Sequence, residues 1–328
     1  MSVSSTPGRM RSSAASPAEG EASANRFPPL LVICGPTATG KTGLSLAVAE
    51  SLPGVEIVGA DSRQVYRGMD IGTAKVSAAG RARVPHHCLD LVDPDQRFTA
   101  ADFLAHARAA LGGIAARGGV ALLVGGTGLY IRAICRGMAL DETGSDPQLR
   151  AQLEQRMVEE GLHAMVARLR SRAPQVAART DLANPRRVVR ALERVELGGD
   201  RLPPAPRGYP APVAWLGLDI DRLTGDRWIA ARARWQFDHG LLEEAAALRA
   251  RYDESLPPFS AIGYREALAV LDGTLTAEEA IEVVARRTRQ FARRQRTWFR
   301  NEPEVEWLDA AADPLPAALK RAARLLAR

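Results

Sequence analysis

The chain has 328 residues, more than one typical domain, so we expect a main domain that carries an inserted or appended part. Basic residues exceed acidic ones by 44 − 38 = 6, and most of them are arginine, whose planar guanidinium suits phosphate oxygens. Aromatic residues make up only 5%, which disfavours a surface that binds oligonucleotides by stacking bases. Three widely spaced cysteines, Cys34, Cys88 and Cys135, exclude a disulfide framework or a zinc site and favour the cytoplasm. No segment is apolar for long enough to span a membrane.

The first half of the chain alternates strand-like and helix-like segments. Residues 1–28, rich in small residues and proline, are predicted to be a disordered N-terminal extension. The core, residues 29–140, contains the apolar runs Leu30–Cys34, Val55–Ala60 and Val120–Val124, each separated from the next by helical periodicity. This alternation predicts an α/β fold whose parallel sheet is covered by helices on both faces. Its ligand crevice would lie at the carboxyl ends of the strands.

The second half is predominantly helical. Residues 141–200 show apolar residues at helical spacing and are predicted to form an inserted helical subdomain. Residues 201–328 return to the core with a strand at Val213–Ile220. They continue with helices at about 222–240, 241–251, 264–271 and 277–300.

A glycine-rich loop follows the first apolar run. It fits the pattern GxxxxGK[ST] with Gly35, Pro36, Thr37, Ala38, Thr39, Gly40, Lys41 and Thr42. In such a loop, backbone N–H groups and a helix N-terminus converge on phosphate oxygens, while the lysine adds a full charge. The Thr42 hydroxyl is the candidate ligand for Mg²⁺. The loop therefore predicts a site for a diphosphate or a nucleotide.

Asp61 is the one carboxylate at the end of a predicted core strand near this loop. The third strand ends in glycines without the acid that nucleotide triphosphatases normally use to hold Mg²⁺. Asp61 could ligate the metal, cap a helix, or act as a base on an acceptor beside the phosphates. The residues around it alone do not decide among these roles.

The segments Asp61–Tyr66 (DSRQVY) and Gly68–Lys75 (GMDIGTAK) resemble the tRNA dimethylallyltransferase family, whose patterns are DSxQxY and GxxIGTAKP. Val76 replaces the final proline of the second pattern. Further matches follow in the family's order at 85–87, 101–103, 123–130, 184–187, 263–265 and 288–290. The resemblance covers about residues 30–307.

The resemblance implies that an adenosine amine in the anticodon stem-loop of tRNA attacks dimethylallyl diphosphate and releases diphosphate. The loop from Gly35 to Thr42 would bind the diphosphate with Mg²⁺, and Asp61 would accept the amine proton. Lys41, Thr127 and Arg232 would complete the catalytic group. Thr127 could also cap the helix that starts near Leu129, and the two roles are compatible. Trp228 stands where the family often has another arginine near Arg232.

Arginines are dense near the C-terminus. Their steps of 3, 4, 3 and 4 residues place Arg286, Arg289, Arg293, Arg296 and Arg300 on one helical face, with few acids nearby in the sequence. Such a face is either solvated or in contact with a polyanion, and the missing acids favour phosphate contact. A second arginine cluster lies in the predicted insertion and consists of Arg186, Arg187, Arg190 and Arg194. It would flank the crevice from the other side if the insertion folds over it.

The resemblance assigns tRNA contacts to residues across the chain. They are Asp61, Ser62, Arg63, Gln64, Thr127, Arg150, Arg186, Arg187, Arg190, Gly263, Tyr264, Arg265, Arg289, Arg293 and Arg296. We expect a cytoplasmic monomer whose partners are tRNA and dimethylallyl diphosphate, with no membrane. The alternatives are a prenyltransferase acting on a free adenine nucleotide, a kinase, and a non-catalytic RNA-binding protein.

Overall fold

The computed structural model describes residues 27–140 and 145–327. Within this part, six strands form one fully parallel sheet in the order β3-β2-β4-β1-β5-β6. The strands are β1 (Leu30–Cys34), β2 (Val55–Ala60), β3 (His86–His87), β4 (Val120–Gly125), β5 (Val213–Asp219) and β6 (Val305–Asp309). The three strands at the centre carry the apolar runs, because both of their faces are buried.

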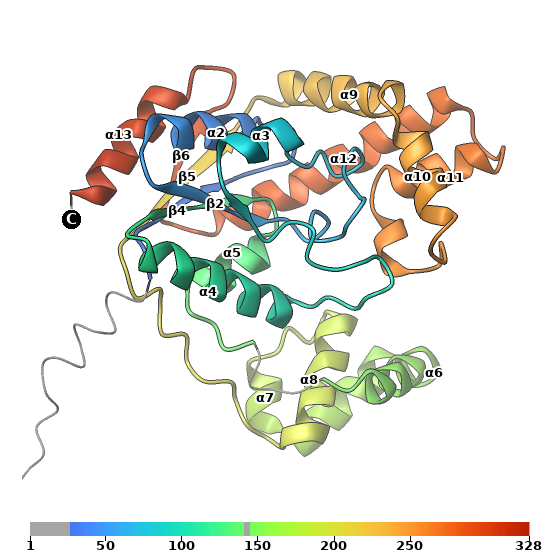
Figure 1. Cartoon of the computed structure of the whole chain (residues 1–328). Helices are drawn as coiled ribbons and strands as arrows, with labels where there is room; N and C mark the ends of the chain where they lie inside the picture. The colour runs from blue at the N-terminus through green and yellow to red at the C-terminus, as the bar shows by residue number, and fades with distance from the viewer. Residues whose placement is uncertain (1–26, 141–144, 328) are drawn as a thin grey trace, which may run out of the picture.

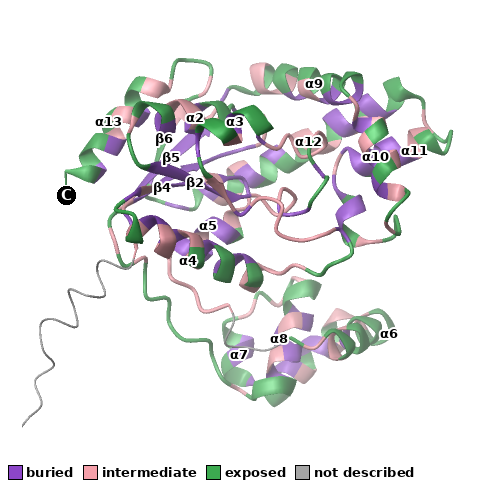
Figure 2. Cartoon of the chain, viewed as in Figure 1, coloured by how far each residue is buried: buried purple, intermediate pink, exposed green. Residues whose placement is uncertain are grey.

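Helices cover both faces of the sheet, so the predicted α/β class is confirmed (Figure 1). One face packs against α2 (Lys41–Ser51) and α13 (Leu315–Leu326), with α3 (Ala78–Arg83) beside them. The other face packs against α4 (Ala100–Ala116) and α5 (Gly128–Cys135). Alternate residues of β1 enter the two cores, and Figure 2 shows the strands buried between the exposed outer sides of these helices.

A second layer of helices covers the carboxyl ends of the strands. It consists of α9 (Arg222–Asp238), α10 (Leu241–Arg249), the short η1 (Pro257–Ser260), α11 (Tyr264–Leu271) and α12 (Ala277–Arg300). Their apolar sides form a separate core with the segment after β2, including Val65 and Met69. This core holds α9 and α12 beside the glycine-rich loop, where the cleft opens.

The insertion has its own small core. It contains α6 (Pro147–Arg172), α7 (Pro174–Ala178) and α8 (Pro185–Gly198), and α6 is interrupted at Gly161, where φ is 77°. Buried Leu153, Met165 and Leu192 pack these helices together. Figure 1 shows them grouped below α4, apart from the sheet. Residues 141–144, where the insertion was expected to begin, lie outside the described residues.

Some sequence-based expectations need correction. The edge strands β3 and β6 were not predicted, since β3 has two residues and β6 alternates apolar with charged side chains. The expected disordered extension lies outside the described residues up to 26, but its last two residues are packed. Phe27 contacts Tyr209 edge-on, and the Tyr209 hydroxyl donates to the Pro28 carbonyl at 2.9 Å. None of the described helices is both long and apolar enough to cross a bilayer.

Candidate active site

The glycine-rich loop joins β1 to α2 and depends on glycine at two positions. Gly35 has φ 134°, and a Cβ there would lie 2.3 Å from the Leu218 carbonyl oxygen on β5. Gly40 has φ 78° and precedes the first turn of α2. The buried Thr39 hydroxyl donates to the Pro36 carbonyl at 2.9 Å and fixes the curve of the loop. The two glycines and the Thr39 hydroxyl therefore shape a concave loop at a helix N-terminus, packed against β5.

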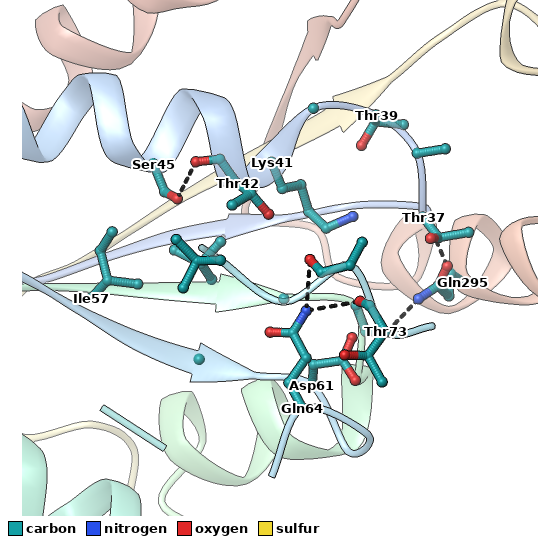
Figure 3. Close-up of a pocket in the computed structure, with 18 of the residues that line it drawn as sticks. Thr37, Thr39, Lys41, Thr42, Ser45, Ile57, Asp61, Gln64, Thr73 and Gln295 are labelled. Atoms are coloured by element: carbon teal, nitrogen blue, oxygen red, sulfur yellow. Dashed lines mark hydrogen bonds between the residues drawn. The ribbon is translucent and has the colours of Figure 1, made fainter. Parts of the chain in front are cut away.

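Lys41 extends from the start of α2 along the inside of this loop (Figure 3). Its ammonium group donates to the Pro36 carbonyl. Burial and, to a smaller extent, the nearby Arg232 lower the pKa of Lys41 to about 8, while Asp61 opposes the shift. The next residue, Thr42, lines the same cavity, and its carbonyl accepts from the Ser45 hydroxyl at 2.9 Å. The Lys41 ammonium and the Arg232 guanidinium therefore both contact residues of the loop.

Asp61 follows β2 and does not cap a helix. Its Oδ1 accepts the Arg63 backbone N–H at 2.8 Å, which closes a tight turn. Thr127 occupies the N-cap position of α5, yet its hydroxyl makes no cap and instead accepts the Ser62 N–H at 3.0 Å. The capping alternatives for both residues are therefore wrong. This bond joins the ends of β2 and β4 directly beside Asp61.

Gln64 is oriented by the loop that follows it. Its Nε2 donates to the carbonyls of Thr73 at 3.1 Å and Ala74 at 3.4 Å (Figure 3). Gln64, Thr73 and Ala74 all line the cavity next to Asp61. The donor end of the amide is therefore engaged with the protein.

Glu244 on α10 is a site-forming residue that the sequence reasoning missed. Its carboxylate accepts the backbone N–H groups of Asp70, Ile71 and Gly72 at 3.0, 2.7 and 3.1 Å. It also accepts the Tyr264 hydroxyl at 2.5 Å. These bonds hold the turn that leads to Thr73. No sequence signal identified Glu244, because an acidic residue in the first turn of a helix ordinarily reads as a favourable dipole contact.

Two cavities meet at Asp61. Both are lined by Thr37, Asp61, Thr73, Arg232 and Phe291. The first continues along the glycine-rich loop to the apolar side chains of Ile57, Val76 and Leu89. The second continues past Ser62 and is lined by the arginines Arg63, Arg186, Arg287 and Arg294. Asp61 thus lies between a cavity bounded by the glycine-rich loop and apolar side chains and a cavity lined by arginines.

Arg232 on α9 lies at this junction. Its Nη1 donates to the Thr37 hydroxyl at 3.1 Å. Burial lowers the pKa of Arg232, and Asp61 partly offsets that shift. Trp228, one turn earlier on α9, lines only the first cavity. The pair therefore presents one cation and one aromatic ring to the loop.

The arginine face of α12 is only partly free of acids. Arg296 donates to Asp219 Oδ1 at 2.8 Å and to the Ile220 carbonyl at 3.0 Å, and Arg300 lies 3.6 Å from Asp219. The expectation that this row lacks pairing acids is wrong at these two positions, since β5 brings in an acid distant in sequence. Arg289 and Arg293 form no ion pair with any described residue.

Several other predicted tRNA contacts have structural partners. Arg150 and Arg190 both bind the fully buried carboxylate of Glu193, at 2.8 and 2.7 Å. Arg187 pairs with Asp181 at 3.3 Å, whereas Arg186 lines the second cavity. The first two arginines therefore hold the insertion together.

The predicted tRNA contacts at the start of α11, residues 263–265, also include both buried and exposed residues. Tyr264 is fully buried, so the expected tRNA contact of its side chain is corrected to a structural role. Gly263 is also buried, with φ 101°, and its N–H donates to Glu266 at 2.8 Å. Arg265 is exposed.

Taken together, the parallel sheet, the GxxxxGK[ST] loop and the two joined cavities define an α/β enzyme whose cleft has room for two substrates. The IPP transferase family model matches residues 64–302. The chain belongs to the tRNA dimethylallyltransferase family.

Individual relatives agree over nearly the whole chain. The tRNA dimethylallyltransferase of Anaeromyxobacter sp. (strain K) is 49% identical and aligns with 85% of this chain and 92% of its own length. That of Roseiflexus castenholzii is 46% identical over 90% of this chain and 96% of its own length. The crystal structure of the tRNA isopentenylpyrophosphate transferase from Bacillus halodurans has a TM-score of 0.64 at 37% identity. It covers 91% of this chain and 99% of its own.

Proposed function

We propose that the protein transfers the dimethylallyl group of dimethylallyl diphosphate to the N6 amine of the adenosine on the 3′ side of the anticodon in tRNA. The observation that carries this proposal is the meeting of two cavities at Asp61. One has the loop for a diphosphate and an apolar end for a short hydrocarbon. The other is rimmed by arginines that suit an RNA backbone.

The diphosphate would lie along the glycine-rich loop, against the N-terminus of α2. Lys41 and Arg232 are placed to neutralise the charge that develops on the leaving oxygen as the bond to the first carbon breaks. The apolar side chains of Ile57 and Val76 give the hydrocarbon a place away from water.

Mg²⁺ is proposed to bind together with the diphosphate. No group of three acidic, histidine or cysteine side chains in the described part of the chain offers a complete site for a metal. Mg²⁺ commonly binds through one or two protein oxygens and substrate phosphates, so the Thr42 hydroxyl and the diphosphate fit that donor set. The metal would supply further charge neutralisation on the leaving group.

Asp61 is proposed as the general base. One of its oxygens accepts the Arg63 N–H, which orients the carboxylate, and Asp61 lines both cavities. As the adenine nitrogen bonds to the first carbon of the prenyl group, the carbon–oxygen bond breaks toward diphosphate. The surplus proton of the amine passes to the Asp61 carboxylate.

The tRNA is proposed to enter from the second cavity. An adenine stacked in an anticodon loop must be turned out to reach Asp61, which requires contacts to the backbone on both sides of it. Arg186 on α8 of the insertion and Arg294 on α12 both line this cavity, so two separate elements contribute arginines to it. Exposed Arg293 extends the basic surface along α12. Because tRNA is the acceptor, we place the reaction in the cytoplasm.

Incubation with unmodified tRNA and labelled dimethylallyl diphosphate, followed by nucleoside mass analysis, tests the proposal. We expect one dimethylallyl group on adenosine and release of diphosphate. Transfer to free adenosine monophosphate but not to tRNA would favour the nucleotide prenyltransferase. Consumption of ATP with an unchanged tRNA mass would favour the kinase.

A further inference from the structure

Gln295 on α12 connects two segments that lie far from it in the sequence. Its side chain is buried, with 7% of its surface exposed. Its Oε1 accepts the Thr37 backbone N–H at 2.8 Å, and its Nε2 donates to the Gly126 carbonyl at 2.9 Å (Figure 3). A buried amide with both ends hydrogen-bonded is held in one orientation, because either group left alone would be costly.

The first bond fixes the start of the glycine-rich loop. With its N–H directed to Gln295, Thr37 keeps its hydroxyl toward Arg232, which donates to it at 3.1 Å. Thr37 and Arg232 both line the two cavities. Gln295 therefore influences the position of Arg232 through Thr37.

The second bond fixes the turn after β4. Gly126 packs so closely on the amide that a Cβ at this position would lie 2.2 Å from Gln295 Nε2. The residue that follows is Thr127, whose hydroxyl accepts the Ser62 N–H beside Asp61. The Gln295 side chain thus sets the distance between the glycine-rich loop and the turn after β4, which lies beside Asp61.

The same helix carries the basic surface. Arg296, the neighbour of Gln295, ties α12 to Asp219 at the end of β5. Arg289 and Arg293 lie on an outer side of α12, and Arg293 is exposed. A shift of this helix when RNA phosphates bind would move Gln295 and, through its two bonds, both the loop and the turn.

We propose that Gln295 is a positioning residue that couples tRNA binding on α12 to diphosphate binding in the glycine-rich loop. This inference rests on the proposed function. Coupling of this kind is reciprocal, so each ligand should raise the affinity for the other by the same factor. A residue that only packs the fold would change stability without changing that factor.

The test measures binding of inorganic pyrophosphate with Mg²⁺ by calorimetry, with and without saturating unmodified tRNA. In the natural protein we expect tRNA to tighten pyrophosphate binding by about tenfold, within the usual range of coupling between sites. In Gln295→Met the factor should fall to about one. Thr297→Ala, an exposed change two residues away on α12, should keep the natural factor.

Gly126→Ala provides a second variant that leaves Gln295 in the chain but displaces its amide, and it should also abolish the factor. It serves if Gln295→Met does not fold, as judged by circular dichroism. An equal factor in the natural protein and in the folded variant would overturn the inference, as would no effect of tRNA in the natural protein. Transfer of labelled dimethylallyl to tRNA in the same preparation separates either failure from a failure of the proposed function.

Discussion

The backbone N–H of Ser62 donates to the hydroxyl of Thr127 at 3.0 Å, and this bond ties the carboxyl ends of β2 and β4 together beside Asp61. Thr127→Val keeps the shape of the side chain and removes the acceptor. We expect single-turnover prenyl transfer to slow by about fivefold, the equivalent of one ordinary hydrogen bond. Thr127→Ser restores the hydroxyl and should stay near the natural rate. Equal rates in both variants would show that this hydrogen bond does not contribute to transfer.

Asp61→Asn tests the base. The amide oxygen can still accept the Arg63 N–H, so the turn should persist. We expect turnover to fall about a hundredfold or more, with binding of both substrates largely kept. The measurement is single-turnover transfer across a Mg²⁺ titration. If Asp61 were chiefly a metal ligand, diphosphate binding would weaken and added Mg²⁺ would restore the rate, which a missing base does not permit.

Lys41 predicts a pH dependence of diphosphate binding. Its protonated form attracts the anion, and its pKa is lowered to about 8. Affinity for inorganic pyrophosphate should therefore be full below this pKa and weaken as the pH rises through it. Pyrophosphate itself gains charge over the same range, so the comparison is with Lys41→Met, which lacks the titrating group. The ratio of the two affinities should shrink with rising pH, and a constant ratio would contradict the prediction.

The arginines of α12 should separate into two groups. Arg289→Gln with Arg293→Gln should weaken tRNA binding and reduce its salt dependence by about 0.7 per lost contact in log–log slope. Turnover at saturating tRNA should survive. Arg296→Gln should instead lower the melting temperature, because it breaks the bond to Asp219. An unchanged salt slope in the double variant would assign that face to solvent.

Glu244→Ala should act on the turn before Thr73. It removes the acceptor of three backbone N–H groups and one hydroxyl. We expect about 3 kcal/mol less stability, since the buried Tyr264 hydroxyl and the half-buried N–H groups of Ile71 and Gly72 lose their acceptor, together with slower transfer. Denaturant unfolding measures the first effect. Glu243 is an exposed acid on the same turn of α10, so Glu243→Ala is the matched control. It should leave the stability and the rate of transfer unchanged.

The amino-acid sequence by itself determined the local parts of this protein. A glycine-rich loop between a strand and a helix, an acid after the next strand, and apolar runs of strand length all follow from neighbouring residues. They were sufficient to predict the inner strands of the sheet, the loop and the place of Asp61. The family motifs added the expected chemistry.

Only the tertiary structure decided how distant side chains pair. Gln295 lies 258 positions from Thr37, and Arg296 meets an acid that lies 77 positions away. Spacing along one helix predicted a continuous arginine face, but it contains no information about Asp219, which arrives from another strand. Tyr264 looked like an RNA contact in its motif and is buried against Glu244. Hydrogen bonds and ion pairs depend on separation in space, and folding sets that separation independently of distance along the chain.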